Sequence, residues 1–147
     1  HIAASRPAEN GYRVALVDDD LYLWEVCFSG FDAAEPIARD MAALGVAEIV
    51  MHVRFPPDYP FAPPFCRIVR PRFAFHTGHV TVGGSICMEL LTRHGWSPEN
   101  TVEALCMSVR STWLAGGARL DRHCRRDYTE AEAREAFQRL LRQHGWE

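Results

Sequence analysis

Residues 83–91 read Gly-Gly-Ser-Ile-Cys-Met-Glu-Leu-Leu, and the rest of the chain is most readily interpreted around this stretch. Cys87 follows two glycines and a serine, and a short apolar run follows the cysteine. Glycine permits backbone conformations and close approaches that other residues prevent. We therefore expect a loop whose thiol a bulky partner can reach, anchored to a core by the apolar run. The pattern makes Cys87 a candidate nucleophile that could serve a protein-sized partner.

Upstream of this stretch the sequence favours strands. Residues 12–17 and 21–28 form a predicted hairpin around three aspartates, with Tyr22, Trp24, Val26 and Phe28 on one face. Residues 35–44 carry apolar side chains at helical spacing and precede a glycine, so they predict a short helix. Two further strands are predicted over residues 46–55 and 65–69.

Between the last two strands, residues 55–64 contain five prolines, which exclude a helix or a central strand. We call these residues the proline strap. The composition predicts a stiff, extended segment that packs on the core. Phe61 is a candidate for contact with a partner at its edge.

Downstream of Cys87 the sequence favours helices. Asn100 or Thr101 can cap a helix that ends at two glycines, residues 116 and 117. Its predicted buried stripe is Val102, Leu105, Cys106, Val109, Trp113 and Leu114. Residues 129–132 form a capping box for a last helix that ends at Gly145. Its predicted inward residues are Ala133, Ala136, Phe137, Leu140 and Leu141.

Strands first and helices later predict an α+β fold, a four-stranded antiparallel meander sheet with helices covering one face. The 147 residues suit a single domain over 1–147, with residues 1–11 as a poorly ordered lead-in. A net charge of −3 gives no electrostatic reason for nucleic acid binding, and no apolar run is long enough to span a membrane. Five cysteines without a C-x-x-C pair favour free thiols in a reducing compartment, the cytoplasm or the nucleus.

Residue pattern alone leaves several roles open for Cys87. A free cysteine is most often a small buried hydrophobe. A thiol hydrolase is a second interpretation, because His76, His79 and His94 are near in sequence. The same histidines with Cys87 could bind zinc, but they lack the short paired spacing of structural zinc sites. A basic segment, Arg119, Arg122, Arg125 and Arg126, is predicted to be a solvated face, with a partner-binding patch as the alternative.

Three motifs in order resemble the ubiquitin-conjugating enzymes. They are the proline strap, the Gly-Ser-Ile-Cys-Met-Glu-Leu-Leu run of residues 84–91, and the Gly-Trp-Ser-Pro run of residues 95–98. The wording around Cys87 resembles the Q branch of the family, as do Asp-Leu-Tyr at residues 20–22, the predicted helix before the third strand and the final His-Gly-Trp. The resemblance covers about residues 12–147.

This resemblance implies an acyltransferase. Cys87 would accept the carboxyl end of ubiquitin, or of a ubiquitin-like protein, as a thioester from an activating enzyme. A substrate amine would then receive it with a ligase's help. No metal or small cofactor is implied, since ATP is used by the activating enzyme only. The alternative is a catalytically silent scaffold of the same fold that binds ubiquitin or a ligase.

The resemblance also implies partner contacts. In the family, the aromatic residue of the proline strap and the Ser-Pro turn meet the ligase. Phe61, Ser97 and Pro98 match those positions, and Glu99 would lie on the rim of that surface.

Three features depart from the family pattern. His79 stands where most members have the asparagine of a His-Pro-Asn tripeptide, so its ring is predicted either to support the oxyanion or to hold the loop. Asp121 is the nearest match to an acidic residue that steers the incoming amine. The first helix, which binds the activating enzyme in the family, is predicted to be truncated or absent before Tyr12.

Overall fold

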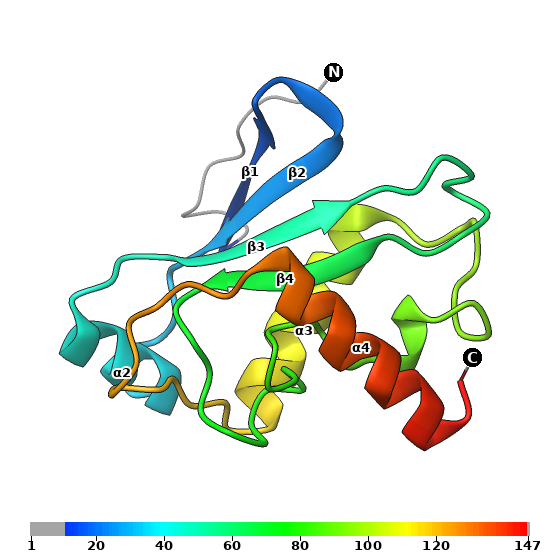
Figure 1. The fold of residues 1–147 in the computed structure, drawn as a ribbon. Helices are drawn as coiled ribbons and strands as arrows, with labels where there is room; N and C mark the ends of the chain where they lie inside the picture. Colours follow the sequence, from blue (N-terminus) through cyan, green and yellow to red (C-terminus); the bar gives the residue numbers. More distant parts are fainter. Residues whose placement is uncertain (1–10, 147) are drawn as a thin grey trace.

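The computed structural model describes residues 11–146. Four strands pair in chain order as one antiparallel sheet, which confirms the predicted meander (Figure 1). They are β1 (Tyr12–Val17), β2 (Asp20–Phe28), β3 (Ile49–Arg54) and β4 (Phe65–Arg70). The helices are α2 (Pro36–Leu44), α3 (Val102–Ala115) and α4 (Glu130–His144), and a single 3-10 turn, η1 (Glu89–Leu91), follows Cys87. Figure 1 shows α3 and α4 below the sheet and α2 beside one end of it.

The β1–β2 hairpin turns at Asp18 and Asp19, whose φ angles are 51° and 59°. Two successive positive φ angles give a turn whose twist matches that of the flanking strands, and aspartate tolerates this conformation better than most residues. Tyr22 lies beyond the core near this turn and is exposed, whereas Val26 and Phe28 on the same face are buried. Alternation therefore predicted the inward face correctly only for the half of β2 that other elements cover.

The third strand begins at Ile49, three residues later than the sequence predicts. Helix α2 ends at Gly45, which has a φ of 70°. The N–H of Val46 donates to the carbonyl of Met41 at 3.0 Å and so closes the last turn of the helix. Because the Val46 N–H closes the last turn of α2, Val46 does not begin the strand, and residues 47 and 48 connect the helix to β3.

The main core lies between the sheet and α3. Four of the predicted stripe residues of α3 are buried, namely Leu105, Cys106, Val109 and Trp113. The indole of Trp113 packs edge-on against Phe28 with 4.8 Å between ring centroids. Leu114 is 36% exposed, so the prediction that it faces the core is wrong. On the opposite face of the sheet Cys27, Val50 and Val69 form a small second cluster.

The capping box of α4 is confirmed. The Glu132 N–H donates to the Thr129 hydroxyl at 3.2 Å, and the Thr129 N–H donates to the Glu132 carboxylate at 3.1 Å. Of the predicted inward residues only Ala133 and Ala136 are buried. Phe137, Leu140 and Leu141 are partly exposed because the second half of α4 borders hollows on the surface of the molecule.

The predictions of a poorly ordered lead-in and of a truncated or absent first helix concern residues 1–11, of which 1–10 lie outside the described residues. Gly11 itself is held in place: its carbonyl accepts hydrogen bonds from the Ser29 N–H at 3.0 Å and from Arg110 at 2.8 Å. Within residues 11–146, none of the helices has the length and hydropathy needed to cross a membrane.

Candidate active site around Cys87

Cys87 ends a small hairpin that runs along the edge of β4. The Cys87 N–H donates to the carbonyl of His79, and the Thr81 N–H donates to the carbonyl of Ser85 at 2.9 Å. The Ile68 N–H of β4 donates to the carbonyl of Gly84 at 2.7 Å. These backbone bonds attach the hairpin to the edge of the four-stranded sheet through an isolated bridge between Arg67 and Ser85. They fix the main chain of Cys87 at the point where the hairpin leaves the sheet.

The two glycines of this hairpin make room for α4 rather than for a separate partner. Both are buried. A Cβ added to Gly83 would lie 2.2 Å from the carbonyl oxygen of Glu132, and one added to Gly84 would lie 2.5 Å from the ring of Tyr128. The expectation that the glycines let a bulky partner approach the thiol is therefore wrong, since the approaching chain is the protein's own last helix and the residues before it.

His79 and Cys87 bind each other through two hydrogen bonds. Besides the backbone bond, Nδ1 of His79 lies 3.2 Å from the carbonyl oxygen of Cys87. A carbonyl only accepts, so Nδ1 carries the hydrogen and Nε2 of the neutral ring has none. The ring holds the loop through Nδ1. A bond from Nε2 to an oxyanion would require the doubly protonated ring.

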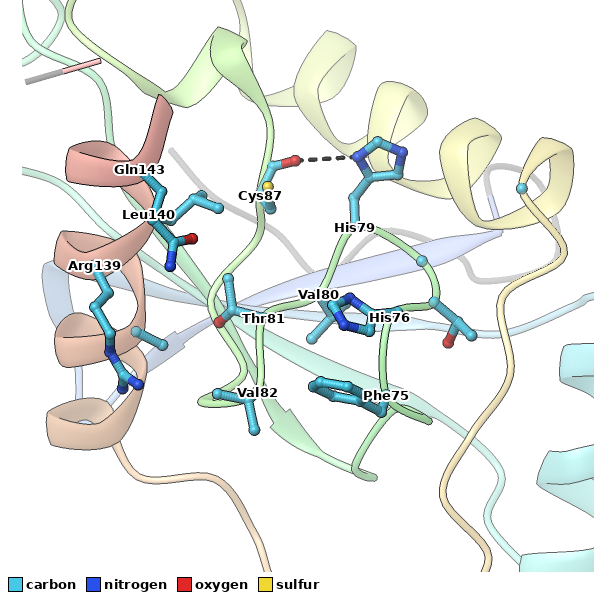
Figure 2. Close-up of a pocket in the computed structure, with 14 residues that line it drawn as sticks. Phe75, His76, His79, Val80, Thr81, Val82, Cys87, Arg139, Leu140 and Gln143 are labelled. Atoms are coloured by element: carbon cyan, nitrogen blue, oxygen red, sulfur yellow. Dashed lines mark hydrogen bonds between the residues drawn. The ribbon is translucent and has the colours of Figure 1, made fainter. Parts of the chain in front are cut away.

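A cavity of about 470 Å³ lies beside Cys87. One wall is the segment from Phe75 to Val82, and the other is α4, from which Arg139, Leu140 and Gln143 project toward the loop (Figure 2). The sequence pattern indicated no role for Arg139 or Gln143 and predicted Leu140 in the core, whereas Leu140 is half-buried at the cavity. The signal that could have found them is their spacing with Ala136, which puts the four residues on one face of the helix.

Cys87 is half-buried, and burial raises the pKa of its thiol above the usual value. At neutral pH the thiol is therefore mostly protonated. Cys27, Cys66 and Cys106 are buried, and Cys124 is the second half-buried thiol of the chain. Burial raises the pKa of Cys27 to about 11 and that of Cys106 to about 12, so these two thiols are poor nucleophiles.

Asp121 does not line this cavity. One of its carboxylate oxygens accepts the N–H groups of His123 at 2.8 Å and Cys124 at 3.2 Å. It organises the loop between α3 and α4. Its predicted role in steering an amine stays a prediction.

The predicted ligase contacts come together at another edge. The indole N–H of Trp96 donates to the carbonyl of Pro60 at 2.8 Å and ties the proline strap to the Ser-Pro turn. Phe61 follows Pro60 in the chain and Ser97 follows Trp96, so this bond brings Phe61 and Ser97 onto adjoining segments. Phe61 is 78% exposed, and Pro98 and Glu99 are also exposed. An exposed aromatic residue on a stiff support is suited to contact another protein.

The arginines of the basic segment after α3 are exposed, as predicted, and the sequence did not show that three of them also bind α2. Asp40 of α2 is fully buried, and its carboxylate accepts hydrogen bonds from Arg119 at 2.7 Å and from Arg122 at 2.8 Å. The Leu120 N–H donates to the same carboxylate at 2.9 Å. The hydrogen bonds from these donors, led by the Arg119 guanidinium, hold the pKa of Asp40 well below its usual range. Arg125 donates to the carbonyl of Leu44 at the end of α2.

Within residues 11–146, no group of three or more histidine, cysteine and carboxylate side chains is arranged to hold a metal ion. The alternative zinc set of His76, His79, Cys87 and His94 is therefore not assembled in this fold.

The chain matches the ubiquitin-conjugating enzyme family over residues 3–139. It is 41% identical over 140 residues to a ubiquitin-conjugating enzyme E2 Q-like protein of Drosophila melanogaster, covering 92% of this chain and 45% of that protein. It is 34% identical over 148 residues to the human ubiquitin-conjugating enzyme E2 Q-like protein 1, covering 97% of this chain and 91% of the relative. The chain thus spans under half the length of the Drosophila protein and nearly all of the human one.

The fold is also similar to a solved structure, that of human ubiquitin-conjugating enzyme E2 G1. The TM-score is 0.56 at 29% sequence identity, and the match covers 71% of this chain and 80% of that one. This likeness confirms the α+β fold class.

Proposed function

Because the chain belongs to the ubiquitin-conjugating enzyme family and resembles its Q-like members, we propose that Cys87 carries the modifier. Cys87 accepts the carboxyl end of ubiquitin, or of a ubiquitin-like protein, from an activating enzyme. It then passes this acyl group to a substrate amine with the help of a ligase. The observation that supports this most is the position of Cys87, a half-buried thiol lining a cavity of about 470 Å³ in a loop with a fixed backbone.

Loading is an exchange between two thiols. The Cys87 thiolate attacks the thioester carbonyl on the activating enzyme, a C–S bond to Cys87 forms, and the bond to the other sulfur breaks. The released sulfur takes up the proton that Cys87 gave up. In discharge the nitrogen of the substrate amine attacks the same carbonyl, the Cys87–carbon bond breaks, and the proton of the amine passes to solvent or to the leaving thiolate.

The raised pKa of Cys87 fits a carrier. A thiolate of high pKa is a poor leaving group, so its thioester reacts slowly with water while it waits for an acceptor. The same raised pKa keeps the free thiol mostly protonated at neutral pH. We therefore expect the loading rate to rise with pH between about 7 and 9.

His79 is proposed as a positioning residue. Its Nδ1–H donates a hydrogen bond to the carbonyl of Cys87 and so fixes the position of the thiol in the cavity. Phe61, Ser97, Pro98 and Glu99 are proposed as the ligase contact, because the bond between Trp96 and Pro60 joins the two segments that carry them.

The test is a loading reaction with activating enzyme, ATP and ubiquitin, run on gels with and without reductant. We expect an adduct that reductant removes. In Cys87→Ser the adduct either resists reductant, as an oxygen ester, or disappears. Cys124→Ser is the matched control, because Cys124 is the other half-buried thiol, and it should load like the parent.

Two other outcomes would contradict the proposal. Absence of any adduct with ubiquitin and several ubiquitin-like modifiers would favour the silent scaffold. An adduct formed from a peptide substrate without activating enzyme and ATP would favour a thiol hydrolase.

A further inference from the structure

A second hollow lies on the other side of α4 from Cys87. Its volume is about 640 Å³, and it runs between the proline strap and the helix. Its lining residues from α4 include Arg134, Phe137 and Leu141, whereas those of the Cys87 cavity include Arg139, Leu140 and Gln143. The two hollows share the helix as a wall and have no lining residue in common. We call the second one the strap groove.

The strap groove has an apolar, preformed floor. The rings of Phe65 and Phe137 meet edge-to-face with 5.7 Å between centroids, and Leu141 and Trp146 continue the apolar surface. Four prolines of the strap form the facing wall: Pro56, Pro57, Pro63 and Pro64. Their fixed φ angles leave this wall little freedom, so little conformational entropy is lost when an occupant binds.

The sides of the groove carry an excess of positive charge. Arg54 and Arg134 both bind the carboxylate of Glu130, at 2.9 Å and 3.0 Å. Arg93 is exposed and, within residues 11–146, makes neither a hydrogen bond nor an ion pair. Three guanidinium groups thus face one carboxylate. An apolar floor flanked by three arginines that share one carboxylate complements a ligand with both apolar groups and negative charge.

We propose that the strap groove binds an acidic peptide segment of another protein. Aromatic or aliphatic side chains of the peptide lie in the groove, and its carboxylates bind Arg93, Arg54 and Arg134. A concave site with an aromatic floor suits side chains of an extended or helical peptide. Nucleic acid is disfavoured by the net charge of −3. A membrane surface is disfavoured because the apolar residues line a hollow instead of protruding.

The experiment selects peptides from a phage-displayed library of random dodecapeptides on the 147-residue protein. Selected sequences should be enriched in aspartate or glutamate together with phenylalanine, tryptophan or leucine. One of them is then synthesised with a fluorescein label, and its dissociation constant is measured by fluorescence anisotropy. Arg93→Glu should weaken binding about tenfold, because it replaces an attraction by a repulsion. Arg39→Glu, an exposed charge reversal on α2, should leave the dissociation constant unchanged.

A charge swap makes the result specific to the groove. The same peptide with its acids replaced by lysine should bind Arg93→Glu more tightly than it binds the parent. The proposal is overturned if the library yields no binder, if the binders lack acids, or if Arg93→Glu binds as the parent does. Binding to phosphatidylserine vesicles without peptide binding, or dimers that Arg93→Glu dissociates, would assign the groove to another occupant and also overturn it.

Discussion

The segment that leads to Cys87 contacts the rest of the molecule at two places, which we call the α2 junction and the α4 junction. Different interactions stabilise the two. At the α2 junction the buried carboxylate of Asp40 binds Arg119 and Arg122. The main chain of Arg119 in turn binds the segment before Cys87, since its N–H donates to the Thr77 hydroxyl at 3.2 Å and its carbonyl accepts the Ala74 N–H at 2.8 Å. The α2 junction is therefore held by charge and hydrogen bonds.

The α4 junction is held mainly by shape. Gly83 and Gly84 lie against Glu132, Ala136 and Tyr128 at distances that leave no room for a side chain. An ion pair between Arg72 and Glu132 at 2.7 Å accompanies this contact at its edge. The stability of a junction held by charge should depend on pH and should change little when nearby side chains change in size. The stability of a junction held by shape should be independent of pH and sensitive to side-chain size.

The largest expected effect is at Gly83. In Gly83→Ala the new Cβ would overlap the backbone of Glu132, which cannot move without shifting the start of α4. We expect the free energy of unfolding to fall by about 3 kcal/mol, equally at about pH 7 and pH 5. Urea denaturation followed by circular dichroism measures it.

Gly117→Ala is the control for Gly83→Ala. Gly117 has a φ of 63°, but a Cβ there meets nothing within 4 Å, so only backbone strain of about 1 kcal/mol is expected. Equal losses in the two variants would mean that α4 adjusts freely and that the junction is not held by shape.

The next effect is at Asp40. Asp40→Asn keeps the size of the side chain and removes its charge. Loss of one partner of a buried ion pair costs about 3–5 kcal/mol when the other charge stays buried. Arg119 and Arg122 are about half exposed and can return to water, so we expect a smaller loss, about 2 kcal/mol at pH 7. Urea denaturation of both proteins measures the difference.

The Asp40 contribution should also depend on pH in a defined direction. The folded-state pKa of Asp40 is lowered, so its stabilisation is present above the unfolded-state pKa of about 4 and is lost as the pH falls toward the folded value. The difference between the parent and Asp40→Asn should shrink between about pH 5 and pH 3. A difference that stays constant over this interval would contradict a junction held by charge.

The smallest effect is at His79, between the two junctions. His79 has a φ of 56° and holds the carbonyl of Cys87. Asparagine tolerates this φ and keeps a donor, whereas alanine does neither. His79→Ala should lose about 1 kcal/mol of unfolding free energy, and His79→Asn should lose less.

The loading assay gives His79 a second readout. If His79 acts only by positioning Cys87, His79→Ala should slow loading and discharge alike. Slow discharge with normal loading in His79→Ala would instead favour the oxyanion role for the ring.

Local patterns predicted the elements well because each depends on near neighbours. The capping box at Thr129 and Glu132, the glycine that ends α2 and the α3 stripe all involve residues a few positions apart. Asp40 was missed because its partners come 79 and 82 residues later, and a lone aspartate on a helix looks like a surface residue. The glycine pair was recognised as a close approach, but sequence could not show that α4 is what approaches. The motif predicted Cys87 as the site, and the structure places Cys87 at a cavity, whereas the helix face opposite it depends on how the last helix packs.

The proposed function requires that Cys87 is the site that carries the modifier. Mass spectrometry of the loading reaction, on the intact protein and after trypsin, tests this directly. We expect the intact protein to gain the mass of one ubiquitin or ubiquitin-like modifier less one water, and the tryptic peptide that contains Cys87 to carry the modifier's C-terminal fragment, both removed by reductant. A modifier attached to Cys124 or to an amine, with the Cys87 peptide unmodified, would contradict the proposed function.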